Sequence, residues 1–175
     1  GGVVGSTVSQ LGDNGLIRQT HSYIASGGDG TLAFDSGLVS LLPAGASLLV
    51  DGPSAAVDKA VGVSELTSQL SSLLTLAEGQ ARYIDRLESF TSQLGDVRLA
   101  VQTLTPQISG LGDVITLSGA DALGLQTEAV VVDVSLLPSG ANLNLDNLEF
   151  ISVVGDVAVT LRGGAGANHV VLGGG

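Results

Sequence analysis

The chain has 175 residues, of which 44% are hydrophobic and 13% charged, and its formal charge is −11 at neutral pH. This balance excludes a disordered or highly charged tail, because there is enough apolar material to bury a core. Seventeen acidic residues against six basic ones repel polyanions, so we expect no nucleic-acid partner. The chain contains no Cys, which excludes disulfides and thiolate metal sites.

The composition favours β-structure. Only two Tyr and three Phe accompany 26 Gly, so the core is built from small aliphatic side chains on a glycine-rich frame. Such a core suits thin layers of strands better than a thick globular interior.

No apolar run reaches the length of a transmembrane helix, and we expect no membrane span. Because the chain also lacks Met, we expect it to be a piece of a longer precursor.

Residues 1–62 form a predicted β-rich segment, since short apolar runs alternate with Gly and Ser turns. Residues 63–95 form a predicted helical insertion, in which glycine becomes scarce. Thr75 followed by Glu78 is a possible capping box, which predicts two helices with a break near Thr75, and Gly95 suits the end of the second. The apolar residues at helical spacing are Val63, Leu66, Leu70, Leu73, Ala77, Ala81, Ile84, Leu87, Phe90 and Leu94.

Residues 96–175 return to β-texture and end in a predicted solenoid-like turn. Apolar strand patterns occur at residues 97–101, 113–117 and 128–134. We therefore expect one structural domain, mainly β with a helical insertion. The architecture is a β-sandwich or β-solenoid-like layers of short strands, with one or two helices packed on them.

A thirteen-residue repeat brackets the predicted helices. Residues 39–51 recur as residues 134–146, with nine of the thirteen positions identical. In each copy Leu-Leu-Pro is followed by Ala or Ser and then Gly, residues that favour a tight turn. Each copy is therefore predicted to form a strand, a tight turn and a strand.

The last thirty residues place strand patterns about ten residues apart with Gly at the corners, which is typical of a β-solenoid with one short strand per half-coil. Residues 163–171, Gly-Gly-Ala-Gly-Ala-Asn-His-Val-Val, fit the G-G-x-G-x-D-x-U-x nonapeptide, with Asn168 in the Asp place. This segment resembles the RTX (repeats-in-toxin) group of secreted bacterial proteins. Residues 110–117 carry a looser echo of the same pattern.

The resemblance implies a Ca²⁺ site, because in that family Gly carbonyls and Asp carboxylates of successive turns hold the ion between them. Carried over residue by residue, the implied ligands are Gly163, Gly164, Gly166, Asn168 and Asp113. Asn168 lacks the charge of the family's Asp, and Leu172 shifts the register of a following repeat by one residue. The resemblance also implies an extracellular or cell-surface location.

The remaining polar residues have simpler interpretations. His21 and His169 lack metal-ligand spacing and are interpreted as strand or surface residues. Asn142, Asn144 and Asp146 alternate with leucines, so in a strand they share one face. This face is interpreted as a solvated face; the alternatives are a ladder of cation ligands or a contact surface for another chain. On the second helix Arg82 and Arg86 are expected to pair with the neighbouring acidic residues Asp85 and Glu88.

These patterns favour a structural protein over an enzyme. No catalytic constellation is visible, so we expect a module of an extracellular bacterial assembly: an adhesin, a biofilm-matrix fibre or a surface layer. It would act by β-edge and apolar contacts with copies of itself or with adjoining domains. The alternative is the non-catalytic portion of a secreted RTX-type polysaccharide- or lipid-modifying enzyme. A carbohydrate-binding module is disfavoured, since sugar platforms use aromatic faces and Trp is absent.

Overall fold

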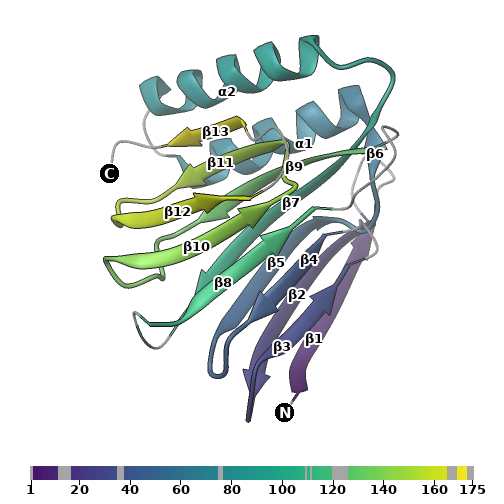
Figure 1. Ribbon diagram of the computed structural model, residues 1–175. Coiled ribbons are helices and arrows are strands. Elements are labelled where there is room, and N and C mark those ends of the chain that lie inside the picture. The colour runs from purple at the N-terminus through teal and green to yellow at the C-terminus, as the bar shows by residue number, and fades with distance from the viewer. Residues whose placement is uncertain are drawn as a thin grey trace.

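The computed structural model describes residues 2–11, 17–34, 38–74, 77–108, 110, 112–119, 126–164 and 169–172. Two helices are inserted between strands β6 and β7 (Figure 1). The strands form two sheets with a shared core, and both helices cover the outer face of the larger sheet. The predicted fold class, mainly β layers with a helical insertion packed on them, is confirmed.

Each sheet combines antiparallel strands from the first part of the chain with parallel strands from the last part. The large sheet has the order β1 (Gly2–Leu11), β2 (Ile17–Ser26), β5 (Ser47–Pro53), β7 (Arg98–Gln107), β9 (Gln126–Asp133), β11 (Phe150–Val154) and β13 (His169–Leu172), with β6 (Val57–Asp58) beside β7. The small sheet has the order β12 (Val159–Gly163), β10 (Ala141–Asp146), β8 (Val114–Ser118), β4 (Val39–Leu42) and β3 (Gly30–Ala33).

From β7 onward the chain winds as a solenoid. Successive strands alternate between the large and the small sheet, so each coil contributes one strand to each. In the large sheet Arg98 lies opposite Gln126, and Phe150 lies opposite both Ala129 and His169. One short strand per half-coil was predicted for the last thirty residues. The structure shows this arrangement over a longer part of the chain, from β7 to β13.

Strand β9 is buried on both faces. Val130 and Val132 belong to the core between the sheets, whereas Ala129 and Val131 belong to the core beneath the helices. A strand covered on both sides has no solvent face, so its sequence is a continuous apolar run rather than an alternating one. The run of hydrophobic residues at 129–132 is explained by this double burial.

Helix α1 (Lys59–Leu73) begins four residues before the predicted start at Val63. Leu66 and Leu70 are fully buried against the large sheet. Gly62 lies where the helix touches β7, and a Cβ there would come within 2.7 Å of the Leu99 side chain. A glycine inside this helix therefore permits close packing on the sheet.

Helix α2 (Ala77–Ser92) ends three residues before Gly95. Its buried face is formed by Tyr83, Leu87 and Phe90, so the expected contribution of Ala81 is wrong: Ala81 is exposed. The two helices are separate, as predicted, and Thr75 of the proposed capping box lies outside the described residues. Among the described residues, no helix has the length and apolar character needed to cross a bilayer.

The two copies of the repeat share a turn but not a hairpin. In both, the Pro carbonyl accepts a hydrogen bond from the Ala three residues later, at 3.0 Å for Ala46 and 3.1 Å for Ala141. Gly45 and Gly140 have φ of 81° and 87°, as a type II turn requires at its third residue. In the first copy the turn joins β4 to β5, which lie in different sheets. In the second copy residues 134–140 form turns, and the predicted leading strand is wrong.

Tyr83 ties α2 to the large sheet, and its ionisation gives a test of that packing. The hydroxyl donates a hydrogen bond to the Val153 carbonyl of β11. Burial raises the pKa of Tyr83 above its usual 10.0, and the nearby Arg82 partly opposes this shift. The unfolded state therefore releases this proton at lower pH than the native state, so stability falls as pH rises above 10.

We expect Tyr83→Phe to lower the free energy of unfolding by about 1 kcal/mol at neutral pH, since a buried hydrogen bond is lost. The difference from the unsubstituted chain should shrink at strongly alkaline pH, because Phe cannot ionise. Urea denaturation at neutral and alkaline pH measures both effects, with Tyr23→Phe as the control. An undiminished difference at alkaline pH would show that Tyr83 does not titrate as argued.

Candidate functional site

The last described coil of the solenoid presents two strand edges that no described strand covers, which together we call the solenoid end: the edge of β13 in the large sheet and the edge of β12 in the small sheet. Among the described strands, β13 pairs only with β11, and β12 pairs only with β10. Between them opens an apolar cavity of about 340 Å³. It is lined by Val134, Val153, Gly155, Val157, Ala158, Val159, Leu161 and Leu172. The core between the sheets is therefore incompletely covered here.

The backbone of β13 shows which groups face outward. The His169 N–H donates to the Glu149 carbonyl at 2.8 Å, so the peptide groups of His169 point toward β11. Backbone groups of successive strand residues point to opposite sides. The N–H and C=O of Val170 and the N–H of Leu172 therefore lie at the free edge, where a further strand could pair with them.

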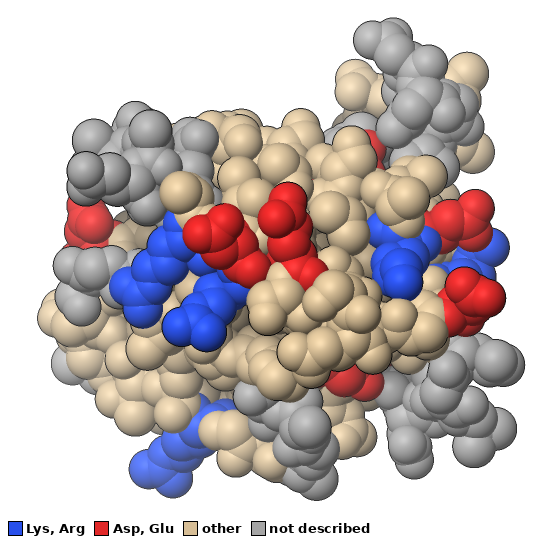
Figure 2. Space-filling view, turned by 90° about the horizontal axis from the view of Figure 1, so that it is seen from above, with Lys and Arg blue, Asp and Glu red and all other residues tan. Residues whose placement is uncertain are grey.

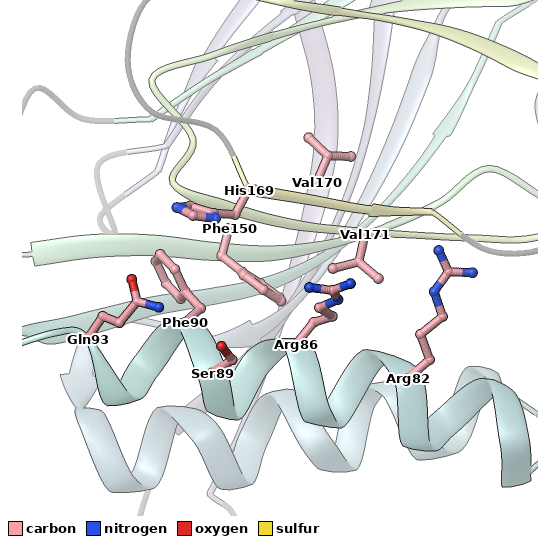
Figure 3. A pocket seen from close by; sticks show the side chains of 9 residues that line it. All are labelled: Arg82, Arg86, Ser89, Phe90, Gln93, Phe150, His169, Val170 and Val171. Carbon is pink, nitrogen blue, oxygen red and sulfur yellow. The ribbon is translucent and has the colours of Figure 1, made fainter.

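A second cavity, also of about 340 Å³, lies between α2 and β13 (Figure 3). On the side of α2, Arg82, Arg86 and Ser89 are spaced by four and three positions, which places them on one polar stripe beside the buried face of the helix, and Gln93 follows directly after the helix ends. The lining residues are Arg82, Arg86 and Ser89 from α2, Phe90 from its buried face, Gln93 directly after the helix, Phe150 from β11, and His169, Val170 and Val171 from β13.

The floor of this cavity is aromatic and rigid. The ring of Phe90 lies 5.1 Å from that of Phe150 and 5.2 Å from that of His169, measured between ring centres. Phe150 is 1% exposed and Phe90 is 8% exposed, so both rings are held by the core. A charged group that enters the cavity would therefore lose part of its hydration against apolar surface, which strengthens its interaction with an opposite charge.

The cavity is basic although the chain is acidic. Arg82 and Arg86 are two of only six basic residues, and no Asp or Glu is among its lining residues. Their expected pairing with Asp85 and Glu88 is wrong: within the described part of the chain neither guanidinium forms an ion pair or a hydrogen bond. Figure 2 looks down on the helical side, where basic side chains gather with acidic ones beside them.

Strand β1 at the other end of the large sheet is a long free edge. It pairs with β2 over ten residues and with no other described strand. It contains no charged residue, and Val4, Val8 and Leu11 are 65%, 57% and 75% exposed. Natural edge strands usually carry Lys, Pro or a bulge that discourages pairing. At this end the two sheets approach closely, because a Cβ on Gly30 of β3 would overlap the Val3 side chain.

The implied calcium ligands are not all brought together. Gly163 and Gly164 lie at the end of β12, whereas Asp113 precedes β8, at the opposite end of these parallel strands with β10 between them. Gly166 and Asn168 lie outside the described residues. The described residues hold no group of three or more His, Asp or Glu side chains arranged to bind a metal.

A different carboxylate lies beside these glycines. A Cβ on Gly164 would overlap the Asp146 side chain, whose Oδ1 is buried with no hydrogen-bond partner among the described residues. As predicted, Asn142, Asn144 and Asp146 share the face of β10 opposite the buried Leu143 and Leu145. The cation-ladder interpretation pointed to this strand, but the proximity of Asp146 to Gly164 depends on the pairing of β10 with β12.

The two histidines have structural surroundings, in agreement with the sequence interpretation. His21 Nδ1 lies 2.7 Å from Thr7 Oγ1 and 2.9 Å from Tyr23 Oη, within a polar cluster on β1 and β2. His169 packs on Phe90. Comparison with protein-family models, with curated protein sequences and with solved structures found no match to this chain.

The corner beside Asp146 depends on a glycine, and this gives a stability test. The Gly119 N–H donates to the Asp146 carbonyl at 2.9 Å, and a Cβ on Gly119 would overlap the Asn147 carbonyl. We expect Gly119→Ala to lower the free energy of unfolding by about 1–3 kcal/mol, because the backbone has to shift. Thermal denaturation measures the loss. Gly95→Ala is the control, since nothing lies within 4 Å of its Cβ position; equal stability of the two variants would contradict the close approach.

Proposed function

We propose that this chain is a structural module of an extracellular bacterial assembly, such as an adhesin, a biofilm-matrix fibre or a surface layer. It acts by pairing strand edges and apolar surfaces with copies of itself or with adjoining domains. The observation that carries the proposal is the edge of β1, which is ten residues long, contains no charged residue, exposes Val4, Val8 and Leu11, and pairs with no described strand other than β2. An edge of this kind is a template for another strand.

The length of β1 supports pairing between two copies. At about 3.4 Å per residue an antiparallel pair of β1 strands would extend for roughly 30 Å, with up to about one backbone hydrogen bond per residue. Two identical edges related by a twofold axis meet without charge repulsion, because β1 contains no charged residue. The solenoid end then remains available to a different partner, so one module can make contacts at both ends.

Calcium stabilisation is part of the proposal. Gly164 lies beside the Asp146 side chain at the corner where β12 ends. The Asp146 carboxylate and the carbonyls of Gly163 and Gly164 would supply the oxygen ligands that Ca²⁺ prefers. A bound ion would satisfy the buried Asp146 Oδ1. Asp113 is not included, because it lies at the other end of the strands.

The self-association test places a charge on the edge of β1. We expect the unsubstituted chain to associate as its concentration rises, and Val8→Lys to shift it toward the monomer by at least about tenfold in dissociation constant, because a lysine on each edge opposes pairing. Analytical ultracentrifugation measures this. Leu41→Lys on β4, also an exposed apolar residue, is the matched control. A chain that stays monomeric, or a control that dissociates equally, contradicts the proposal.

The calcium test compares melting temperatures in EDTA and in excess Ca²⁺. We expect Ca²⁺ to raise the melting temperature, because an ion bound only to the folded chain stabilises it by mass action. Asp146→Asn should abolish the increase, whereas Asp113→Asn should retain it. Loss of the increase in Asp113→Asn alone, or no increase in the unsubstituted chain, removes calcium from the proposal.

A further inference from the structure

We propose that the second cavity, the groove between α2 and β13, binds an extended peptide segment of alternating acidic and apolar residues. The bound segment joins the large sheet as its next strand. This inference concerns the solenoid end and goes beyond self-association through β1. It depends on three features of the described residues: free backbone groups, a two-sided environment and unpaired guanidinium groups.

The backbone groups fix where the segment lies. The outward N–H and C=O of Val170 and the outward N–H of Leu172 are donors and acceptors for an added strand. Such a strand would lie about 4.8 Å beyond β13, alongside α2, which runs beside β13 in Figure 1 and Figure 3. Main-chain pairing supplies affinity without selecting a sequence.

The two sides of β13 determine which side chains the segment carries. Val171 belongs to the core beneath the helices, whereas Leu172 lines the apolar cavity between the sheets. Side chains of an added strand alternate in the same way. Those on one side would fill the cavity lined by Val157, Val159 and Leu161, and those on the other side would face the polar stripe of α2.

The polar stripe selects acidic side chains. Arg82 and Arg86 are four residues apart on α2, a rise of about 6 Å along the helix. Alternate residues of a strand are about 6.8 Å apart, so two successive acidic side chains match two successive arginines. Arginine binds carboxylates in a bidentate manner, and the aromatic floor of Phe90 and Phe150 makes this pairing stronger than one in open solvent. Ser89 and Gln93 continue the stripe with hydrogen-bonding groups.

The segment comes from a different polypeptide region than the free edges described in this chain. None of the edge strands β1, β3, β12 and β13 contains an Asp or Glu. A second copy that docked one of these edges on β13 would leave Arg82 and Arg86 without carboxylates. The geometry therefore distinguishes the partner at the solenoid end from the partner at β1.

The test uses three labelled eight-residue peptides in which Val alternates with Glu, Gln or Lys, with fluorescence anisotropy as the readout. The Val8→Lys variant of the whole chain is the binding partner, so that association through β1 does not interfere. We expect the Glu peptide to bind at least about tenfold more tightly than the Gln peptide, and the Lys peptide more weakly still. Equal binding of the Glu and Gln peptides would overturn the charge selection.

Variants separate the charge contribution from the backbone contribution. Arg82→Gln combined with Arg86→Gln should weaken the Glu peptide at least about tenfold and leave the Gln peptide unchanged; Arg162→Gln on β12 is the matched control. Val170→Pro should weaken both peptides, because it removes an outward N–H, while Val170→Thr retains it. If inorganic phosphate displaces the Glu peptide and Val170→Pro has no effect, the groove is an anion site and strand addition is wrong.

Failure of this inference is distinguishable from failure of the proposed function. Loss of peptide selectivity with retained self-association leaves β1 as the assembly edge and removes only the acidic partner. Retained peptide binding in a chain that never self-associates removes the β1 contact and leaves the solenoid end as a peptide-binding site.

Discussion

Burial of small aliphatic side chains on both faces of the large sheet is the constraint on which the structure depends. Val130 and Val132 fill the space between the sheets, while Ala129 and Val131 support the helices. Because aromatic residues are few, neither layer of the core can be thick. The core is filled by packing the backbones of neighbouring elements close together, and not by large side chains. Gly62 illustrates this, since it brings α1 against Leu99. The helices cover only part of the outer face of the sheet (Figure 1). Its end strands β1 and β13 each pair with one described strand, so each has one unpaired edge among the described residues.

The two free ends of the large sheet differ in chemistry, and this difference organises the proposed function. At β1 the edge is uncharged and the sheets close on each other through Val3 and Gly30. At β13 one face of the strand borders the apolar cavity between the sheets, and the other face borders the basic cavity beside α2. In the proposed function these unlike surfaces suit unlike partners, since the uncharged edge matches a copy of itself and the basic cavity matches acidic side chains. A module with this polarity can join a like neighbour and an unlike one.

Much of the fold could be predicted from local pattern, because period and turn chemistry are local properties. The helical insertion and the half-coil spacing near the end of the chain followed from the distribution of Leu and Gly. The partners of each strand could not be predicted, since pairing joins residues as far apart as Ser47 and Gln107. For the same reason the sequence connected Asp113 with Gly163, whereas the structure places Asp146 beside Gly164. The spacing of Arg82, Arg86, Ser89 and Gln93 was visible, but not the strand they face.

The repeated turn shows what a short repeat encodes. Leu42 and Leu137 both point inward before the turn, and Ala46 and Ala141 do so after it, although one copy leads from the small sheet to the large sheet and the other leads back. The motif thus specifies a change of layer without specifying its direction. The same short turn can therefore connect two stacked sheets in either direction, and the pairing of the flanking strands determines which direction is taken.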